Sequence, residues 1–328
     1  MFKNKKILIT GGTGSLGQAL TKRLLQYDVD TIRLYSRDEL KQTQMSESLD
    51  DPRLRFLVGD IRDKERLSMS MHNIDIVFHT AAIKHVPIAE YNPFEAIKTN
   101  VVGSQNVVWC CLQNKVKQAI AIGTDKAVSP LNTYGATKLL MEKIFASANF
   151  YAGFEGKFLS VRYGNVLGSR GSILPKFLDS IKKRNEITIT DPAMTRFNIT
   201  MNQATDLIFR ALKHGRSGDI FVPKLKSYSV ETMKDAILEL SDVKNINVKK
   251  ISKRPGEKDH EMLLIKDEII NTTESSFDYI ISNPGVENII PKSVSKLKNT
   301  TLKDNYSSDT VKLLSKSELK SIITSNIL

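Results

Sequence analysis

The residues best suited to chemistry are Tyr134 and Lys138, which lie four positions apart. On a helix this spacing places both side chains on one face. A phenol has a pKa of about 10, so a tyrosine acts as a base near neutral pH only if the phenolate is favoured by roughly 4 kcal/mol. One ammonium about 4 Å away, at an effective dielectric constant near 20, supplies on the order of 4 kcal/mol. The spacing therefore fits an activated tyrosine, although an ordinary surface helix has the same pattern.

A glycine-rich turn near the N-terminus is the second feature. Gly11, Gly14 and Gly17 follow a predicted strand, Lys6–Thr10, and open a predicted helix that runs to about Tyr27. Glycines permit a tight turn and close backbone approach to a pyrophosphate, and a helix N-terminus favours negative charge. The pattern alone is weak, but its place between a strand and a helix predicts a dinucleotide-binding turn.

The end of the second predicted strand, Thr31–Tyr35, bears on the choice of cofactor. The residues that follow are Ser36, Arg37 and Asp38. An acidic residue here would accept hydrogen bonds from the ribose hydroxyls, whereas a basic one would meet a 2′-phosphate. Arg37, with Lys41 one helical turn further on, therefore favours NADP over NAD; the alternative is that both are surface charges.

Polar residues also follow the third and fourth predicted strands, Arg55–Val58 and Asp75–His79. Asp60 can accept a hydrogen bond from an adenine amino group, and N-capping of the next helix is a rival role there. The small residues after the fourth strand let the backbone lie close to a flat cofactor. Lys84 projects where ligands bind in open α/β sheets, while His85 is interpreted as structural.

Strand and helix patterns alternate six times in residues 1–165, where Gln118–Ile122 and Leu159–Tyr163 supply the fifth and sixth strands. This alternation predicts an α/β fold with a parallel, doubly wound sheet. The pattern loosens after residue 165. We expect segments at about 196–222 to return to the first domain, and residues 166–195 and 223–328 to form a smaller substrate-binding domain at the carboxyl edge of the sheet.

Composition limits the class of protein. The 328 residues are 41% hydrophobic and 26% charged, as in soluble globular proteins. No apolar run approaches the roughly 20 residues that span a membrane, and no signal peptide is evident. Cys110 and Cys111 are adjacent and indicate packing in a reducing compartment. We therefore expect a cytoplasmic protein without membrane contact and without a metal.

The net charge of +12 raises the question of nucleic-acid binding. The basic residues are scattered, and no stacking strand or groove-reading helix accompanies them. A nucleoside-diphosphate ligand and an anionic cofactor account for positive charge equally well, so we expect no nucleic-acid partner.

The glycine pattern and the Tyr-x-x-x-Lys pair together resemble the extended short-chain dehydrogenase/reductase superfamily, over residues 5 to about 260. Further motifs follow in order: Ser-Arg-Asp-Glu-Leu-Lys (36–41), Lys-His-Val-Pro-Ile-Ala-Glu-Tyr-Asn-Pro (84–93), Thr-Asp-Lys (124–126), Arg-Tyr-Gly-Asn-Val (162–166), Ser-Arg-Gly-Ser (169–172), Met-Thr-Arg-Phe (194–197) and Arg-Pro-Gly-Glu-Lys (254–258). They resemble the configuration-inverting UDP-N-acetylglucosamine 4,6-dehydratases of the pseudaminic acid type. Leu16, where relatives commonly carry Phe, and Thr80, where Ala is usual, are small departures, and the tail after 260 is only loosely similar.

The resemblance implies a Rossmann-type domain, NADP as cofactor and UDP-N-acetylglucosamine as substrate. C4 of the sugar is oxidised transiently, water is lost across C5 and C6, and hydride returns to C6. The product is UDP-2-acetamido-2,6-dideoxy-β-L-arabino-hex-4-ulose, a precursor for surface glycans or flagellin glycosylation. Such a cycle returns the cofactor unchanged and needs an acid and a base in addition to the tyrosine.

By the resemblance, Lys126 is the C5 base and Asp125 the acid that assists loss of water, with Tyr134 and Lys138 completing the catalytic set. Adjacent side chains on a strand point to opposite faces, so both can reach one sugar only if the backbone turns at residue 125. A lysine base must also be neutral, which requires burial or a nearby cation. Lys138 or an oxidised nicotinamide could be that cation; a salt-bridged strand end is the alternative interpretation of the pair.

The resemblance also assigns ligand contacts, residue by residue. The expected cofactor-binding residues are Gly11, Thr13, Gly14, Ser15, Leu16, Gly17, Ser36, Arg37, Asp38, Lys41, Asp60, Ile61, Thr80, Ala81, Ala82, Lys84, Asn100, Tyr134, Lys138 and Val166. The expected substrate-binding residues are Lys84, Thr124, Asn165, Thr195, Arg196 and Arg254.

Two other functions fit parts of the pattern. A UDP-sugar 4-epimerase would use the same tyrosine and cofactor but no acid–base pair at 125–126. A non-catalytic NADP-sensing protein would typically have lost Tyr134, Lys138 or both. The resemblance further implies a homo-oligomer in which the Pro93–Asn114 and Tyr134–Phe150 helices pair across a two-fold axis. Hexamers are a further assembly known in the family.

Overall fold

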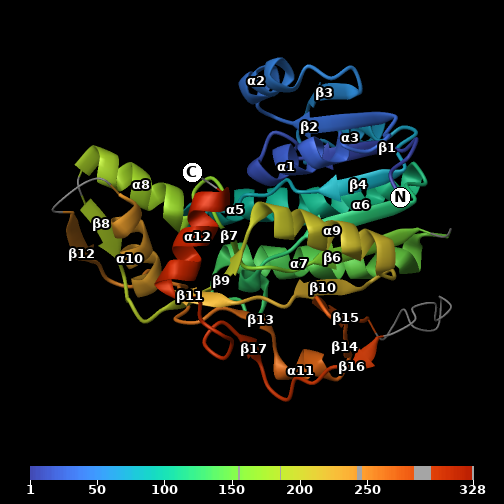
Figure 1. Cartoon of the computed structure of the whole chain (residues 1–328). Helices are drawn as coiled ribbons and strands as arrows, with labels where there is room; N and C mark the ends of the chain where they lie inside the picture. Colours follow the sequence, from blue (N-terminus) through green and yellow to red (C-terminus); the bar gives the residue numbers. More distant parts are fainter. Residues whose placement is uncertain (154–155, 185, 242–245, 284–296, 327–328) are drawn as a thin grey trace.

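The computed structural model describes residues 1–153, 156–184, 186–241, 246–283 and 297–326. Within them the chain forms a large mixed sheet with helices on both faces and a smaller lobe beside one end of the sheet (Figure 1). The sheet order is β16-β14-β15-β10-β6-β5-β4-β1-β2-β3. Its parallel strands are β1 (Lys6–Thr10), β2 (Thr31–Ser36), β3 (Leu54–Val58), β4 (Ile76–His79), β5 (Gln118–Ile122), β6 (Lys157–Val161) and β10 (Ile220–Pro223).

The prediction of a doubly wound sheet is confirmed. β1 pairs in parallel with both β2 and β4, through registers such as Ile7↔Ile32 and Ile7↔Ile76. The chain therefore moves outward in one direction from β1 through β3 and in the other from β4 through β6. Ligands of such sheets bind outside the carboxyl ends of the strands at this reversal point, which is where the glycine-rich turn and the loop after β4 lie.

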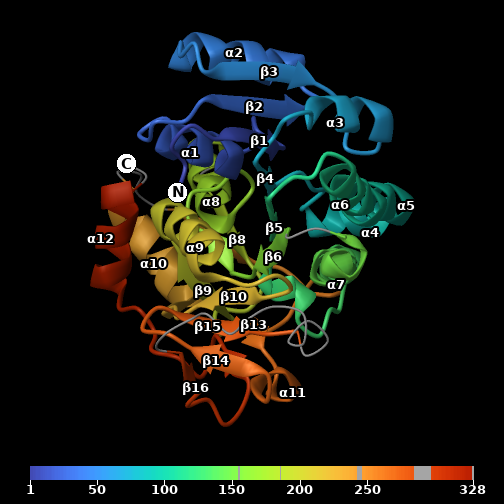
Figure 2. The ribbon, with the colours of Figure 1, turned by 90° about the vertical axis from the view of Figure 1, so that its right-hand side faces the viewer.

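Two layers of helices cover the sheet (Figure 2). One face carries α1 (Ser15–Leu24), α2 (Glu39–Leu49) and α9 (Met201–His214); the other carries α3 (Lys64–Ser70), α6 (Gly103–Gln113) and α7 (Thr133–Ser147). Alternation along β5 serves both faces: Ile120 and Ile122 face the α9 side, while Ala119 and Ala121 face the α7 side. The small alanines let α7 approach the sheet closely.

Aromatic side chains fill the core on the α9 side. Phe2, Phe78 and Phe209 pack with ring centroids 4.7–6.5 Å apart, and burial of such a side chain is worth roughly 1.5–3 kcal/mol. Cys110 and Cys111 are buried on the opposite face and are not disulfide-bonded. Burial raises the pKa of the Cys110 thiol to about 11, so both cysteines serve packing, as the sequence indicated.

The sheet extends further than the sequence predicted. β15 (Asp278–Ile281) pairs antiparallel with β10, and β14 (Thr272–Glu274) and β16 (Lys298–Asn299) follow it. These strands come from the range expected to belong to the smaller domain, residues 223–328. They return because β10 would otherwise expose an unpaired strand edge, and the apolar side chains of β15 are buried against it.

The smaller lobe has its own apolar core. It contains α8 (Ile173–Arg184), α10 (Val230–Leu240), α12 (Lys316–Asn326), and the parallel pair β8 (Glu186–Ile189) and β12 (Asn247–Lys250). Smaller elements connect the lobe to the sheet: β7 (Asn165–Val166), β9 (Thr195–Ile199), β11 (Ser227–Ser229), β13 (Met262–Leu264), β17 (Tyr306–Ser307) and α11 (Lys266–Ile269). None of the helices in the described part of the chain is long and apolar enough to cross a bilayer.

The helix predicted over Pro93–Asn114 is continuous but irregular. It begins as α5 (Pro93–Ala96), follows α4 (Val86–Tyr91), widens into a π-helical segment at Ile97–Val102 and continues as α6. Such widened turns are frequent at functional positions. Here the segment contains Asn100, whose side chain holds the loop after β4.

A buried ion pair fixes α7 against the sheet. Arg162, at the end of β6, donates to Glu142 of α7 (Nη2–Oε2 2.7 Å) and to Glu268 of α11 (Nη1–Oε2 2.9 Å). Arg162 and Glu142 are each 1% exposed. Gly123 makes room for this contact, because a Cβ there would lie 2.4 Å from Glu142 Oε1. Removal of one partner would leave an uncompensated buried charge.

We predict that Arg162→Met lowers the free energy of unfolding by about 3–5 kcal/mol, because Glu142 would lose its charge partner in the core. Urea unfolding followed by circular dichroism measures this loss. The matched control is Lys226→Met, which breaks an exposed pair with Glu318 and should cost at most about 1 kcal/mol. Equal losses in the two variants would contradict a dominant role for the buried pair.

Candidate active site

The backbone turns at residue 125, which is the bend that a shared site for Asp125 and Lys126 requires. Thr124 is extended, its hydroxyl accepts a hydrogen bond from Lys126 N (3.4 Å), and Asp125–Ala127 form a single 3₁₀ turn. The turn replaces the strand alternation that would have separated Asp125 from Lys126, and the two side chains meet at 3.0 Å.

The start of α7 packs directly on this turn. Asn132 caps the helix by accepting from Gly135 N (2.8 Å). A Cβ on Gly135 would lie 2.1 Å from Lys126 O, so only glycine allows this approach. The contact brings Tyr134 to the turn, where its hydroxyl hydrogen-bonds with Thr124.

Lys126 lies between two carboxylates. Its Nζ is 3.0 Å from Asp125 Oδ1, 3.0 Å from Glu261 Oε1 and 3.5 Å from Asn165 Oδ1. Burial alone would lower the pKa of Lys126, but Asp125 and Glu261 outweigh it and the pKa rises above its ordinary value. In the absence of ligands Lys126 is therefore an ammonium, and the neutral state that a base requires is not met.

Asp125 has the properties of an acid. Burial raises the pKa of its carboxyl, against the pull of Lys126. Oδ1 is occupied by Lys126 and Thr124, whereas Oδ2 is buried and has no hydrogen-bond partner among the described residues. A buried, unpaired Oδ2 favours the protonated carboxyl, and a ligand would reach this proton only after a local movement of the side chain.

Tyr134 and Lys138 do not form the activated pair that their spacing suggested. Burial raises the pKa of Tyr134 to about 12, and the opposing influences are Lys126 and the Thr124 hydrogen bond. The Lys138 ammonium instead lies 3.0 Å from Met141 Sδ. Burial lowers the pKa of Lys138 to about 8, against the attraction of Glu142. Activation of the phenol by Lys138 is therefore absent from the ligand-free protein, because burial dominates both groups.

We predict a distinctive pH dependence for Lys138. The unfolded chain holds this proton up to the ordinary lysine pKa of 10.5, while the folded chain releases it above about 8. Wild type should therefore gain stability relative to Lys138→Met, by roughly 3 kcal/mol, as the pH rises through this window. Urea unfolding at about pH 7.5 and about pH 10.5 measures the difference. Lys143→Met, at an exposed position of the same helix, is the matched control, and a pH-independent difference for Lys138→Met would contradict burial as the cause.

The glycine-rich turn has the geometry of a pyrophosphate cradle. Gly11 has a φ of +68°, and a Cβ there would lie 2.8 Å from Ala81 N. Gly14 precedes α1 without any side-chain cap, so the first amide groups of the helix remain available to an anion. Thr80 anchors the adjoining loop by donating from its hydroxyl to Thr10 O (2.7 Å).

At the end of β2, Arg37 is 58% exposed, with Asp60 as its nearest carboxylate at 3.5 Å. Asp60 is held more closely by Arg62 (2.7 Å), which lowers its pKa despite burial. The cap of α3 is Asp63, so the rival N-capping role does not fall to Asp60. Lys41 pairs with Asp38, which also caps α2.

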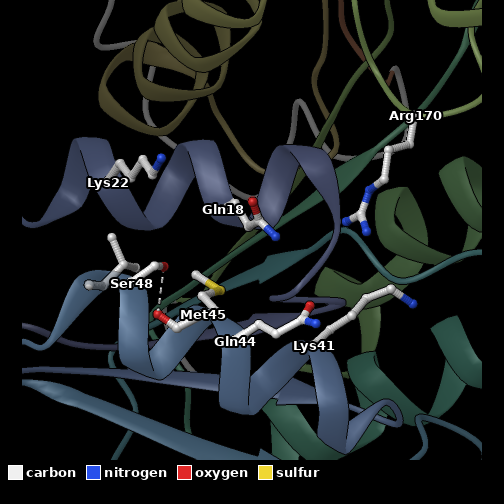
Figure 3. Close-up of a pocket in the computed structure, with 8 residues that line it drawn as sticks. Gln18, Lys22, Lys41, Gln44, Met45, Ser48 and Arg170 are labelled. Atoms are coloured by element: carbon white, nitrogen blue, oxygen red, sulfur yellow. Dashed lines mark hydrogen bonds between the residues drawn. The ribbon is translucent and has the colours of Figure 1, made fainter.

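A cavity of about 280 Å³ opens between α1, α2 and the loop after β7 (Figure 3). Its charged lining residues are Lys22, Lys41 and Arg170. Arg170 comes from the Ser-Arg-Gly-Ser motif and crosses to the glycine-rich turn, where it donates to Thr13 O (2.5 Å). This cavity therefore presents only positive charge next to the end of β2.

Further cations come from the loop after β4, from α8 and from the loop after β12. Burial lowers the pKa of Lys84, and Arg170 and Lys176 lower it further. The pKa of Lys176 is lowered by burial and by Arg254. Lys84, Lys176 and Arg254 form no ion pair within the described ranges. Cations that repel one another without a carboxylate partner indicate a site for polyanionic ligands.

Several expected ligand residues use their polar atoms inside the protein. The Asn100 amide bonds to Ile83 N, Ile83 O and Thr137 Oγ1, and Thr195 bonds to His260 and Ser308. Ile61 is core. Three more are also bonded internally: the Thr13 hydroxyl donates to Ser36 Oγ, and Arg196 donates to Thr195 O and Asp259 O. The remaining assigned residues lie in or next to the elements at the carboxyl edge of the sheet: Ser15, Leu16, Gly17, Ala82 and Val166.

Sequence reasoning missed Glu261 and Lys176, and it quoted Arg170 only within a motif. Arg170 could have been found from its basic, glycine-flanked loop. Glu261 lies 135 positions after Lys126 in a segment of weak similarity, and no local pattern marks it. No group of three or more potential metal ligands occurs in the described part of the chain.

Comparison with known proteins places the chain in a family. Residues 7–283 match the family model described as polysaccharide biosynthesis protein. The chain belongs to this family. A family member from Campylobacter jejuni, the UDP-N-acetylglucosamine 4,6-dehydratase (inverting), is 47% identical over 86% of this chain and 84% of that protein. The resemblance expected from the motifs is thereby confirmed.

Two further similar proteins bear on the choice between a dehydratase and an epimerase. A UDP-glucose 4-epimerase from Rickettsia felis is 40% identical over 98% of this chain and 96% of that protein. The X-ray structure of Pen from Bacillus thuringiensis superposes with a TM-score of 0.93, with 39% identity, and covers 99% of this chain and 98% of that one. The family thus includes proteins named for both dehydration and epimerisation.

Proposed function

We propose that the protein is an inverting UDP-N-acetylglucosamine 4,6-dehydratase. The observation that carries this proposal is the 3₁₀ turn that brings a carboxyl and an ammonium, Asp125 and Lys126, together beside Tyr134. An epimerase needs the tyrosine but not this pair. The Campylobacter relative supports the same choice.

The residues present fit a nicotinamide dinucleotide. Gly11 and Gly14 would admit its pyrophosphate, and Arg37 and Lys41 would meet a 2′-phosphate, so we propose NADP. When bound, this cofactor supplies a reversible hydride acceptor for C4 of the sugar and a hydride donor for C6. Lys84, Lys176 and Arg254, which have no ion-pair partner among the described residues, would neutralise the diphosphate groups of cofactor and substrate.

The protein's own groups perform the proton transfers. Tyr134 must first lose its own proton, because burial raises its pKa to about 12. As the phenolate it takes the proton of the 4-hydroxyl while C4 becomes a ketone, and the ketone makes the C5 hydrogen acidic. Lys126, which Asp125 and Glu261 hold as an ammonium, must lose a proton first, and as the free amine it then takes the C5 proton. Asp125 gives its carboxyl proton to the departing 6-hydroxyl, which leaves as water. C6 takes back the hydride that left C4, and a solvent proton that adds to C5 from the opposite face inverts the configuration. Lys126 releases the abstracted proton to solvent, and the net change is loss of one water.

Incubation with UDP-N-acetylglucosamine, followed by mass spectrometry of the nucleotide sugar, tests the proposal. A dehydratase removes one water without consuming added NADPH. An epimerase, the alternative supported by the Rickettsia relatives, leaves the mass unchanged and alters only the C4 configuration. Recovery of unchanged substrate would contradict both.

We predict that substitutions of Tyr134 and Lys126 stop the reaction at different steps. Tyr134→Phe should slow every step, including the transient absorbance of reduced nicotinamide in a single turnover. Lys126→Ala should still oxidise C4 but stall before loss of water, because positioned proton transfer is worth about a hundred- to ten-thousand-fold. Solvent-deuterium incorporation at C5 should disappear in Lys126→Ala. Exchange at the wild-type rate would remove Lys126 as the base.

We predict that Arg37→Ala weakens NADP binding about tenfold or more, because a charge-assisted hydrogen bond contributes about 1.5–3 kcal/mol. NAD binding should be nearly unchanged. Arg62→Ala, which removes a neighbouring arginine from the same carboxylate, is the matched control. Isothermal calorimetry measures NADP and NAD affinities for wild type and both variants, and equal losses of NADP and NAD in Arg37→Ala would show another role.

We also propose a homo-oligomer built on a two-fold dimer. The helices α4 to α7 lie together on one side of the molecule (Figure 2) and expose apolar side chains that a monomer would leave in water. They are Tyr91, Phe94, Ile97, Val102, Trp109 and Leu140. The proposal places the protein in cytoplasmic nucleotide-sugar biosynthesis for surface glycans, of the pseudaminic acid type.

We predict that Leu140→Asp, which puts a charge into this surface, yields monomers at micromolar concentration. Leu140 is 49% exposed in the single chain, and Leu40 on α2 is 63% exposed. Leu40→Asp is therefore the matched control and should leave the assembly intact. Light scattering measures both masses, and a monomeric wild type would contradict the dimer.

A further inference from the structure

Glu261 lies next to the 3₁₀ turn formed by Asp125–Ala127, which is called the catalytic turn below. It lies one residue before β13, and its amide donates to Ser308 Oγ (2.9 Å) while its carbonyl accepts from Ser308 N (2.8 Å). The adjoining His260 bridges to Thr195 of β9. The backbone at residues 260 and 261 is therefore fixed to β9 and to the residue that follows β17.

The carboxylate of Glu261 is deeply buried, at 3% exposure. Oε1 lies 3.0 Å from Lys126 Nζ and 3.9 Å from Arg196 Nε. Oε2 is buried and has no hydrogen-bond partner within the described residues. A buried carboxylate is stable only when it is paired, and its closest cation is the lysine that the proposed reaction needs as a base.

The charges that face Lys126 come from every element around it. The 3₁₀ turn supplies Asp125 and β13 supplies Glu261, while Arg196 of β9 opposes them. Neutral or more distant neighbours complete the surroundings: Asn165 of β7, Tyr134 of α7, Tyr228 of β11, and Lys258 in the loop before β13. The two carboxylates lie 3.0 Å from Lys126 Nζ, and their attraction outweighs the repulsion from Arg196.

We propose that Glu261 is a positioning residue for the reaction proposed above: it holds Lys126 Nζ in place and strengthens its affinity for a proton. When the Lys126 amine takes a proton from C5, the resulting ammonium forms next to an existing carboxylate. No proton passes to Glu261; its negative charge stabilises the product of the transfer. The inference rests on the proposed function for its role in catalysis but not for its effect on Lys126.

The first test needs no substrate. Ligand-free, full-length protein is acetylated with acetic anhydride over a pH series, and labelled Lys126 is quantified by peptide mass spectrometry, because only the neutral amine reacts. Glu261→Gln should move the midpoint of labelling about 1–3 pH units lower, as expected when an opposite charge within contact distance is removed. An unchanged midpoint overturns the proposal.

Two further variants make the test specific. Glu257→Gln is the matched control, since Glu257 lies 3.6 Å from Arg196 and does not pair with Lys126; its midpoint should equal that of wild type. An equal shift in this control would mean a general field effect and would overturn the proposal. Glu261→Asp keeps the negative charge but moves it further from Lys126, because the side chain is one methylene shorter. It should give an intermediate midpoint. If Glu261→Gln fails to fold, as thermal melting would show, this variant decides, and a wild-type midpoint overturns the proposal.

The second test uses the reaction. The pH at which solvent-deuterium exchange at C5 reaches half its maximum should fall in Glu261→Gln, together with the labelling midpoint. A merely structural role would lower the rate without moving this pH. If UDP-N-acetylglucosamine loses no water in wild type, the proposed function fails while the labelling result still stands. If water is lost but the labelling midpoint is unmoved, only the role of Glu261 fails.

Discussion

The buried contact of Arg162 with Glu142 and Glu268 is the interaction on which the active site depends. It ties β6, α7 and α11 together inside the protein, where a charge without a partner is costly. Because Glu142 is on α7, the contact sets the position of that helix, and therefore of Tyr134 and Lys138. The absence of a side chain at Gly123 is part of the same arrangement. The tyrosine and its lysine are thus carried by a rigid element, as precise chemistry requires.

Charge is divided between two regions at the carboxyl edge of the sheet. Near the catalytic turn, Asp125 and Glu261 surround a single ammonium and are shielded from water. Nearer the glycine-rich turn, Lys84 and Lys176 lie among other cations without a carboxylate partner in the described residues. The first region can exchange protons, and the second can neutralise phosphates. A ligand that joins a diphosphate to a hydroxylated ring matches both regions in one orientation, which links the fold to the class of substrate.

Local sequence patterns predicted what depends on neighbours in the chain. The parallel strands, the glycine-rich turn and the need for a bend at residue 125 follow from periodicity, backbone freedom and side-chain alternation, and all three occur. The antiparallel strands at the edge of the sheet and the position of Glu261 depend on contacts between distant segments, so no local spacing predicted them. The state of Tyr134 depends on burial and on the direction of the Lys138 side chain. A four-residue spacing places both on one helix face but does not say that the ammonium turns towards Met141.

The tie from Arg170 to Thr13 O has a consequence for how long a cofactor stays. This hydrogen bond joins the loop after β7 to the glycine-rich turn, and it would slow the exchange of a dinucleotide bound at that turn. Most dehydrogenases must release a reduced cofactor after each turnover, and a loop bonded across the binding turn would slow that release. A catalyst whose hydride goes out and comes back has no such need. For it, slow exchange means that one bound molecule serves many cycles, whatever the ratio of oxidised to reduced cofactor in its surroundings.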